Sequence, residues 1–161
     1  MSALLTGLAI LAALLLNSAL SHVSAPASRI FDPFLLVTVY CGLQRGETHG
    51  MLAGAAAGWV QDAHFGGTVV GLSGLSKVLV GFGAGAAGAR FLLSGPLARA
   101  CVLFAAGMLD SLLVQALAAA FDIRAYELPL PTLLGRAAVN AFVGAALFAG
   151  LDRRLARRTL P

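Results

Sequence analysis

Charge is the scarcest feature of this sequence. Only 11% of the residues are Asp, Glu, Lys or Arg, whereas 59% are hydrophobic. A soluble domain carries roughly 25% charged residues, because its surface must be hydrated. The chain has too few charges to cover a surface in water, so most of its exterior is expected to face lipid. Its length of 161 residues allows one transmembrane domain, residues 1–161.

Reactive and metal-binding side chains are also few. Cys41 and Cys101 are the only cysteines, which excludes a disulfide framework and matches no metal-site spacing. The segments Glu47–His49 and Asp62–His64 fall on opposite sides of the membrane in the topology given below, so they cannot converge on a metal. No nucleophile has a base at readable spacing, and no phosphate-binding glycine loop is present. We therefore expect no enzyme activity, no metal and no cofactor.

The net charge of +4 does not indicate nucleic-acid binding. Nucleic-acid binding proteins present a basic face, commonly with interleaved aromatic residues, and no such face exists here. Instead, four of the eleven basic residues lie in one short tail: Arg153, Arg154, Arg157 and Arg158. A basic tail beside an apolar helix indicates a cytoplasmic anchor near anionic lipid.

The apolar runs predict an all-α, polytopic helical bundle with about six transmembrane helices. A helix of 20 residues spans the ~30 Å hydrocarbon core. The first run also resembles a signal peptide, but no Lys or Arg precedes it, so we expect a retained helix. The expected helices are 2–21, 30–44, 48–62, 69–93, 97–121 and 132–151, followed by a basic cytoplasmic tail, 152–161.

The second and third helices are predicted to be short. Each has about 15 residues and a length of ~22 Å, below the ~17 to 25 residues usual for a span. They are interpreted as short helices in locally thinned bilayer, with a hairpin that enters and leaves on one side as the alternative. Asp32 before Pro33 is a good N-cap for the second helix.

The distribution of arginine predicts the orientation. With six crossings and both termini in the cytoplasm, seven basic residues lie inside and two lie outside, which satisfies the positive-inside rule. The inner set comprises Arg45, Arg90, Arg99 and the four tail arginines, and the outer set comprises Arg29 and Arg124.

Small residues recur at four-residue spacing, as expected where helices approach closely in lipid. Gly50, Gly54 and Gly58 share one face of the third helix. Glycine costs ~1 kcal/mol relative to Ala inside a helix, so three in succession predict a contact surface. This surface serves either internal packing or a partner helix. Similar spacing occurs at Gly81, Gly85 and Ala89, and at Ala137, Ala141, Ala145 and Ala149.

Three polar residues fall inside the predicted membrane spans. Lys77, Asp110 and Asn140 lie ~12, ~16 and ~12 Å from the outer helix ends. An isolated Lys or Asp at mid-membrane costs ~2.5 to 3.5 kcal/mol, so we predict a Lys77–Asp110 contact with Asn140 close by. The favoured role is a structural bolt, with a ligand site or a proton relay as alternatives. A relay would need further acidic or histidine steps across the membrane.

Residues 31–92 resemble part of the MreD family of rod shape-determining membrane proteins. The resemblance rests on Asp32-Pro33, the helix end Tyr40–Gly46, Gly50-x3-Gly54-x3-Gly58, Gln61-Asp62, Gly66-Gly67, Gly71-Leu72 and Gly81-x3-Gly85. Phe82 departs from the Tyr that is frequent in the family. The family is similar in architecture to the six-helix substrate-binding subunits of energy-coupling-factor transporters.

The resemblance implies a non-enzymatic adaptor of the cell-elongation complex in the bacterial inner membrane, where peptidoglycan is synthesised. Its implied partners are the single-span scaffold MreC and, directly or indirectly, MreB, RodA and a penicillin-binding protein. The predicted partner-binding residues are Gly50, Gly54, Gly58, Gln61, Asp62, Gly66 and Gly67.

Two other functions stay open. A substrate-binding subunit of a vitamin-type transporter would need a polar and aromatic pocket, for which Trp59, Asp62 and Tyr126 are the candidates. An enzyme acting on lipid is the weakest possibility, because no cluster of titratable residues marks either interface.

Overall fold

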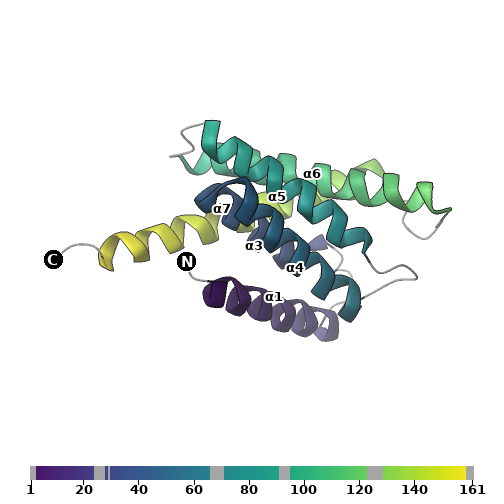
Figure 1. Cartoon of the computed structure of the whole chain (residues 1–161), viewed down its shortest axis with the longest axis horizontal. Helices are drawn as coiled ribbons and strands as arrows, with labels where there is room; N and C mark the ends of the chain where they lie inside the picture. Colours follow the sequence, from purple (N-terminus) through teal and green to yellow (C-terminus); the bar gives the residue numbers. More distant parts are fainter. Residues whose placement is uncertain are drawn as a thin grey trace.

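The computed structural model describes residues 3–23, 28, 30–65, 71–90, 95–122 and 129–158, without the side chains of residues 3, 65, 96 and 151–158. Within these ranges the ordered elements are all helices, so the predicted all-α fold class is confirmed. The helices are α1 (Ala3–Val23), α3 (Pro33–Arg45), α4 (Glu47–Phe65), α5 (Leu72–Arg90), α6 (Pro96–Ala120) and α7 (Leu130–Arg158) (Figure 1).

Four of these helices are long and apolar enough to cross a membrane: Leu4–Val23, Leu72–Arg90, Leu97–Ala120 and Leu130–Gly150. They support a membrane-embedded bundle. α3, with 13 residues, and α4, with 19 residues, are not among them. The structure therefore supports four spans, and the six-span count stays a prediction.

The short α3 is the central helix of the bundle. Nine of its 13 residues are buried, and it contacts α1, α4, α5, α6 and α7. Its first turn is capped by Asp32, whose Oδ1 accepts a hydrogen bond from the Leu35 N–H at 3.1 Å, as the Asp-Pro pair predicted. A helix enclosed by other helices need not match the bilayer thickness, because protein shields its ends.

The successive helices alternate in direction. We call the end at which α1, α4 and α6 finish and α3, α5 and α7 begin the outer end, following the predicted orientation. At the opposite, inner end, Gly46 alone separates α3 from α4. Its φ of 85° lies in the left-handed region that glycine adopts at little cost, so the chain reverses within one residue.

The interior is polar towards the outer end and apolar towards the inner end. The main apolar cluster includes Val80, Ala84, Leu103, Ala141 and Phe148, packed around α3 from Leu35 to Tyr40. The rings of Tyr40 and Phe148 lie 4.9 Å apart, centroid to centroid. The buried Lys, Asp and Asn side chains lie nearer the outer end and form the candidate site.

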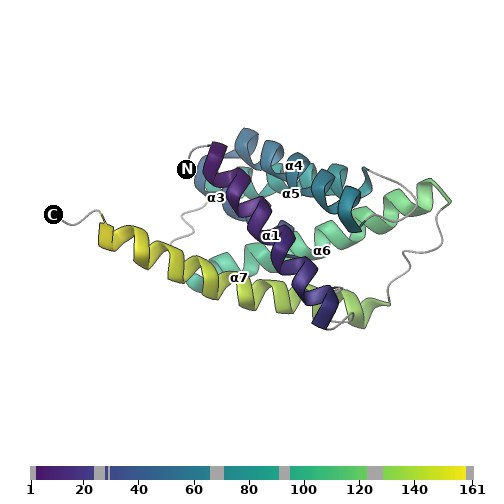
Figure 2. The ribbon, with the colours of Figure 1, turned by 90° about the horizontal axis from the view of Figure 1, so that it is seen from below.

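α1 lies at the periphery. It contacts α3 and α4 and crosses the outside of the bundle (Figure 2). Large apolar side chains cover its outward face, with Leu4 72% and Leu15 63% exposed. Such a face is suited to lipid.

The bound of 151 predicted for the last helix is wrong, because α7 continues to Arg158. The described part of the predicted basic tail, 152–158, is therefore helical. Leu, Ala and Arg are good helix formers and no proline interrupts them, so the helix continues past the apolar span. Figure 1 shows this end of α7 projecting from the bundle.

Candidate functional site

A cluster of charged side chains lies in the outer half of the bundle. The Lys77 Nζ is 2.9 Å from Asp32 Oδ2 and 3.5 Å from Asp110 Oδ2. These three side chains are between 1% and 4% exposed. The predicted Lys77–Asp110 contact is thus present, but the shorter contact of Lys77 is with Asp32.

Asp32 joins more helices than any other member of this cluster. In addition to Lys77, its Oδ2 faces Arg136 Nη2 of α7 at 3.6 Å and accepts a hydrogen bond from Gln61 Nε2 of α4 at 3.4 Å. The cluster holds two carboxylates and two cationic groups, so its formal charge is zero. Paired charges of this kind hold helices in register instead of leaving a reactive group in the membrane.

Asn140 satisfies backbone groups of Ile30 and Asp32, which precede α3. Its Oδ1 accepts the Asp32 N–H at 2.9 Å. Its Nδ2 donates to the carbonyl of Ile30 at 3.0 Å and to that of Arg136 at 2.8 Å. Irregular backbone at membrane depth persists only where such partners replace water, so this amide fixes the point at which α3 begins.

Asp110 is held from α5 as well as by Lys77. The Ser76 Oγ donates to Asp110 Oδ1 at 2.7 Å and lies 3.1 Å from the Asp110 carbonyl oxygen. Ser76 is fully buried. The cluster therefore connects α3, α4, α5, α6 and α7.

Sequence analysis missed Asp32, Arg136, Gln61 and Ser76 as members of this cluster. A signal was available in the charge balance. Once Lys77 is paired with Asp110, Arg136 within the last helix still needs a carboxylate. Asp32, at the outer start of the second predicted helix, is one such carboxylate, and its role as a cap obscured this second function.

The predicted partner-binding glycines face α5 instead of a free surface. A Cβ on Gly54 would overlap the carbonyl of Lys77, and a Cβ on Gly50 would overlap that of Gly81. Gly58 likewise lies against the backbone of Ser73 and Gly74. α4 and α5 run side by side (Figure 1). The assignment of these glycines to a partner is therefore wrong, and they pack internally.

The other described partner candidates, Gln61 and Asp62, do not form an outward surface either. Gln61 points at Asp32, and Asp62 caps α5. The carboxylate of Asp62 accepts the N–H groups of Gly71 at 2.8 Å, Gly74 at 3.2 Å and Ser73 at 3.3 Å. Gly66 and Gly67 lie outside the described residues.

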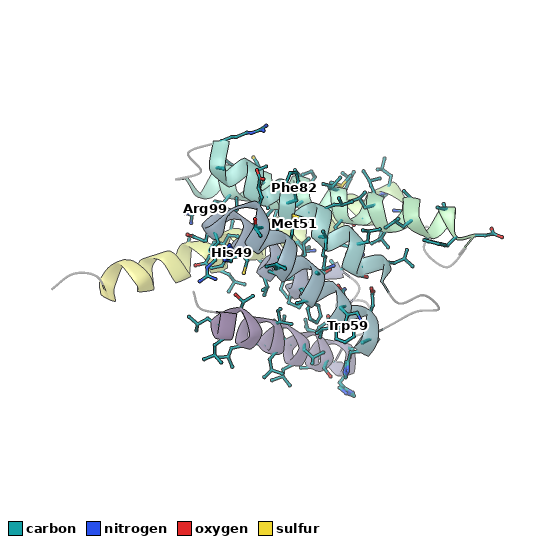
Figure 3. All side chains as sticks on the ribbon, in the orientation of Figure 1. His49, Met51, Trp59, Phe82 and Arg99 are labelled. Carbon is teal, nitrogen blue, oxygen red and sulfur yellow. The ribbon has the colours of Figure 1, made fainter. Side chains whose placement is uncertain are left out.

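The other predicted groups are also spread apart. Trp59 is 66% exposed and points away from the bundle (Figure 3), while Asp62 is buried against α5. Tyr126 lies outside the described residues. The described members of the proposed transport pocket therefore do not converge. No three of the described His, Cys, Asp and Glu residues are grouped so that they could hold a metal ion.

Comparison with known proteins gives no match among family models, curated sequences or solved structures. The resemblance of residues 31–92 to the MreD family stays a prediction from the motifs alone.

Proposed function

We propose that this chain is a non-enzymatic adaptor of the bacterial cell-elongation complex, embedded in the inner membrane with both termini cytoplasmic. The charged cluster carries the proposal. Each of its four charged side chains faces an opposite charge within 3.6 Å, and together they connect four helices. Such an arrangement is suited to a rigid scaffold, since no group is left to react. The motifs of residues 31–92 resemble those of the MreD family, and this resemblance implies the partner, an MreC-like single-span protein.

The partner binds an outward helix face in this proposal, because the glycine face of α4 is occupied by α5. Each of several helices offers an exposed apolar position at which a photo-crosslinking amino acid can be placed. Suitable positions are Leu8, Leu52, Phe82, Leu112 and Phe142.

The test is co-purification with the MreC-like protein of the same bacterium, combined with crosslinking from these five positions. We expect crosslinks from one or two adjacent helices and none from the others, as a defined interface requires. Uniform crosslinking from every helix would indicate random collision. If the two proteins never co-purify and loss of this chain leaves cell shape unchanged, the adaptor proposal is wrong.

The alternative is a substrate-binding subunit of a small-molecule transporter. One observation favours it: the side chain of Arg136 is 23% exposed, so the charged cluster borders the protein surface near the outer end. Vitamin uptake that depends on Arg136 would support this alternative. Uptake that is unchanged on deletion of the chain would eliminate it.

A further inference from the structure

Two buried amide oxygens lack partners at one level of the bundle. Asn17 Oδ1 in α1 and Gln61 Oε1 in α4 are both inaccessible, and neither has a hydrogen-bond partner among the described residues. Asn17 is only 6% exposed. A buried acceptor without a partner is costly, and native proteins rarely keep one.

The packing of α1 on α4 indicates that these two residues face the same interface. Ala13 of α1 and Ala57 of α4 pack in one apolar cluster with Phe34 of α3. α1 and α4 run in the same direction. Asn17 and Gln61 each follow four residues later, so each stands one turn above this cluster on the same helix face.

The orientation of the Gln61 amide follows from its neighbour. Its Nε2 donates to Asp32 Oδ2 at 3.4 Å, and exchanging the two amide atoms would put an oxygen against a carboxylate. Oε1 therefore faces away from Asp32. Because α1 contacts α3 and α4, the inward Asn17 faces this same region at the start of α3.

We propose that the interface of α1, α4 and the start of α3 binds a small neutral hydrogen-bond donor through Asn17 Oδ1 and Gln61 Oε1. The donor is water or the hydroxyl group of a neutral solute. Both protein atoms are acceptors, so the occupant must donate. It must be neutral, because the adjoining charged cluster is already balanced and a further buried charge would be unpaired.

The described residues close this site on its inner side. Phe34 and Ala57 are fully buried and Ala13 is 4% exposed, so an apolar layer closes the site one turn further in. The site is therefore not part of a path across the membrane. It does not depend on the proposed partner.

Thiol labelling tests access to the site. In a chain with Cys41→Ala and Cys101→Ala, Asn17→Cys and Gln61→Cys are treated with a membrane-impermeant thiol reagent from the outer side. Ala13→Cys and Ala57→Cys, one turn further in, are the matched controls. We expect labelling at least about tenfold faster at Asn17→Cys and Gln61→Cys, because the reactive thiolate forms in water and not in an apolar interior.

Added glycerol distinguishes the two sources of the donor. Slower labelling of Gln61→Cys in glycerol identifies a solute hydroxyl, and unchanged labelling identifies water. Labelling at Asn17→Cys and Gln61→Cys as slow as at the two controls would overturn the proposal.

Thermal unfolding in detergent tests whether a donor occupies the site, because an occupied and an empty site predict opposite changes in the unfolding temperature of Asn17→Leu. If a donor is bound, Asn17→Leu lowers the unfolding temperature, as Asn140→Leu must, since Asn140 has three hydrogen bonds. If Asn17 Oδ1 is bare, replacing it with an apolar side chain raises the unfolding temperature. A rise for Asn17→Leu together with a fall for Asn140→Leu would overturn the proposal.

Discussion

Asp32 combines two tasks that are usually carried out by separate residues. Its Oδ1 caps the first turn of α3 through Leu35 N–H, and its Oδ2 faces Lys77 and Arg136. The cap fixes where the helix begins, and the ion pairs fix which helices surround that point. One carboxylate therefore couples the local structure of α3 to the packing of the whole outer half.

Removing Lys77 is expected to be severe. Lys77→Met leaves Asp32 and Asp110 with one remaining cation, Arg136, which lies 3.6 Å from Asp32. Breaking a buried ion pair in this way should lower the free energy of unfolding by about 3–5 kcal/mol. Thermal unfolding in detergent measures the change. Arg136→Gln is the comparison and should cost less, because this side chain is 23% exposed. Equal unfolding temperatures for Lys77→Met and the wild type would contradict the ion pairing.

Charge balance gives a second prediction at this scale. The double variant Lys77→Met/Asp110→Leu removes one charge of each sign and leaves Asp32 with Arg136. It should unfold at a higher temperature than Lys77→Met alone, because a balanced pair replaces an unpaired carboxylate. The two single variants and the double variant form a cycle. If the destabilisations simply add, Lys77 and Asp110 are not coupled.

The Lys77–Asp110 contact could be predicted because both residues lie in long helices, where the count from a helix end gives depth. Asp32 could not be placed in the same way. It precedes α3 in a non-helical segment, and the depth of such a segment is set by Asn140, 108 residues further along the chain. No local sequence pattern predicts a contact between two residues so far apart in the chain.

At the scale of helices, α4 and α5 are packed backbone to backbone. In α4, Gly50 lies against Gly81 of α5, Gly54 against Lys77 and Gly58 against Gly74. There is no room for a side chain on any of these three α4 glycines. Close approach of this kind replaces the hydrophobic effect as the source of helix association in lipid. It also places Lys77 at the centre of the interface, from which its side chain reaches Asp32 and Asp110.

A single methyl group should disrupt this interface at Gly54. Gly54→Ala places a Cβ on the Lys77 carbonyl oxygen, so the helices must separate and the unfolding temperature in detergent should fall. Gly83→Ala on the outward side of α5 is the matched control, because nothing lies within 4 Å of its Cβ position.

In the control, alanine should be neutral or stabilise the helix by about 0.5–1 kcal/mol. A lower unfolding temperature for Gly54→Ala and an unchanged or higher one for Gly83→Ala would show that α4 packs against α5 through Gly54. A neutral Gly54→Ala would mean that α4 and α5 do not approach as closely as described.

Asp62 provides a further test of the same pair of helices. Its carboxylate accepts three backbone N–H groups at the start of α5. Asp62→Ala should destabilise the protein by about 0.5–2 kcal/mol, the range for loss of a helix cap. Asp122→Asn, at an exposed residue whose φ of 55° asparagine also tolerates, should change the unfolding temperature little. If the two variants behave alike, the cap does not stabilise α5.

The long helices α1, α5, α6 and α7 could be predicted from their apolar runs, and the start of α3 from Asp32-Pro33. The side of α4 that meets α5 could not. Glycine spacing shows that something approaches closely, but the same spacing serves an internal neighbour and an external partner equally. Only the positions of the facing residues, Ser73–Gly85 of α5, decide between them.

At the scale of the whole molecule, the α3–α4 turn reaches almost to the inner end of the bundle. Gly85 of α5 lies against Glu47, and Gly88 lies against Leu43, so the turn at Gly46 is level with the last turn of α5. α3 is enclosed by its neighbours from Pro33 to Gly42, with only Val37 half-buried in that stretch. The pair therefore extends from the buried charged cluster to the inner face.

This arrangement makes a prediction that separates the two interpretations of the short helices. Thr48, just after the turn, is exposed. In the cysteine-free chain, Thr48→Cys should react with an impermeant thiol reagent added from the cytoplasmic side, and Asp122→Cys with the same reagent added from the outer side. Both reactions follow if α3 and α4 carry the chain to the inner face and back. If Thr48→Cys reacts from the outer side or from neither side, the turn does not reach the cytoplasm and the hairpin enters and leaves from outside.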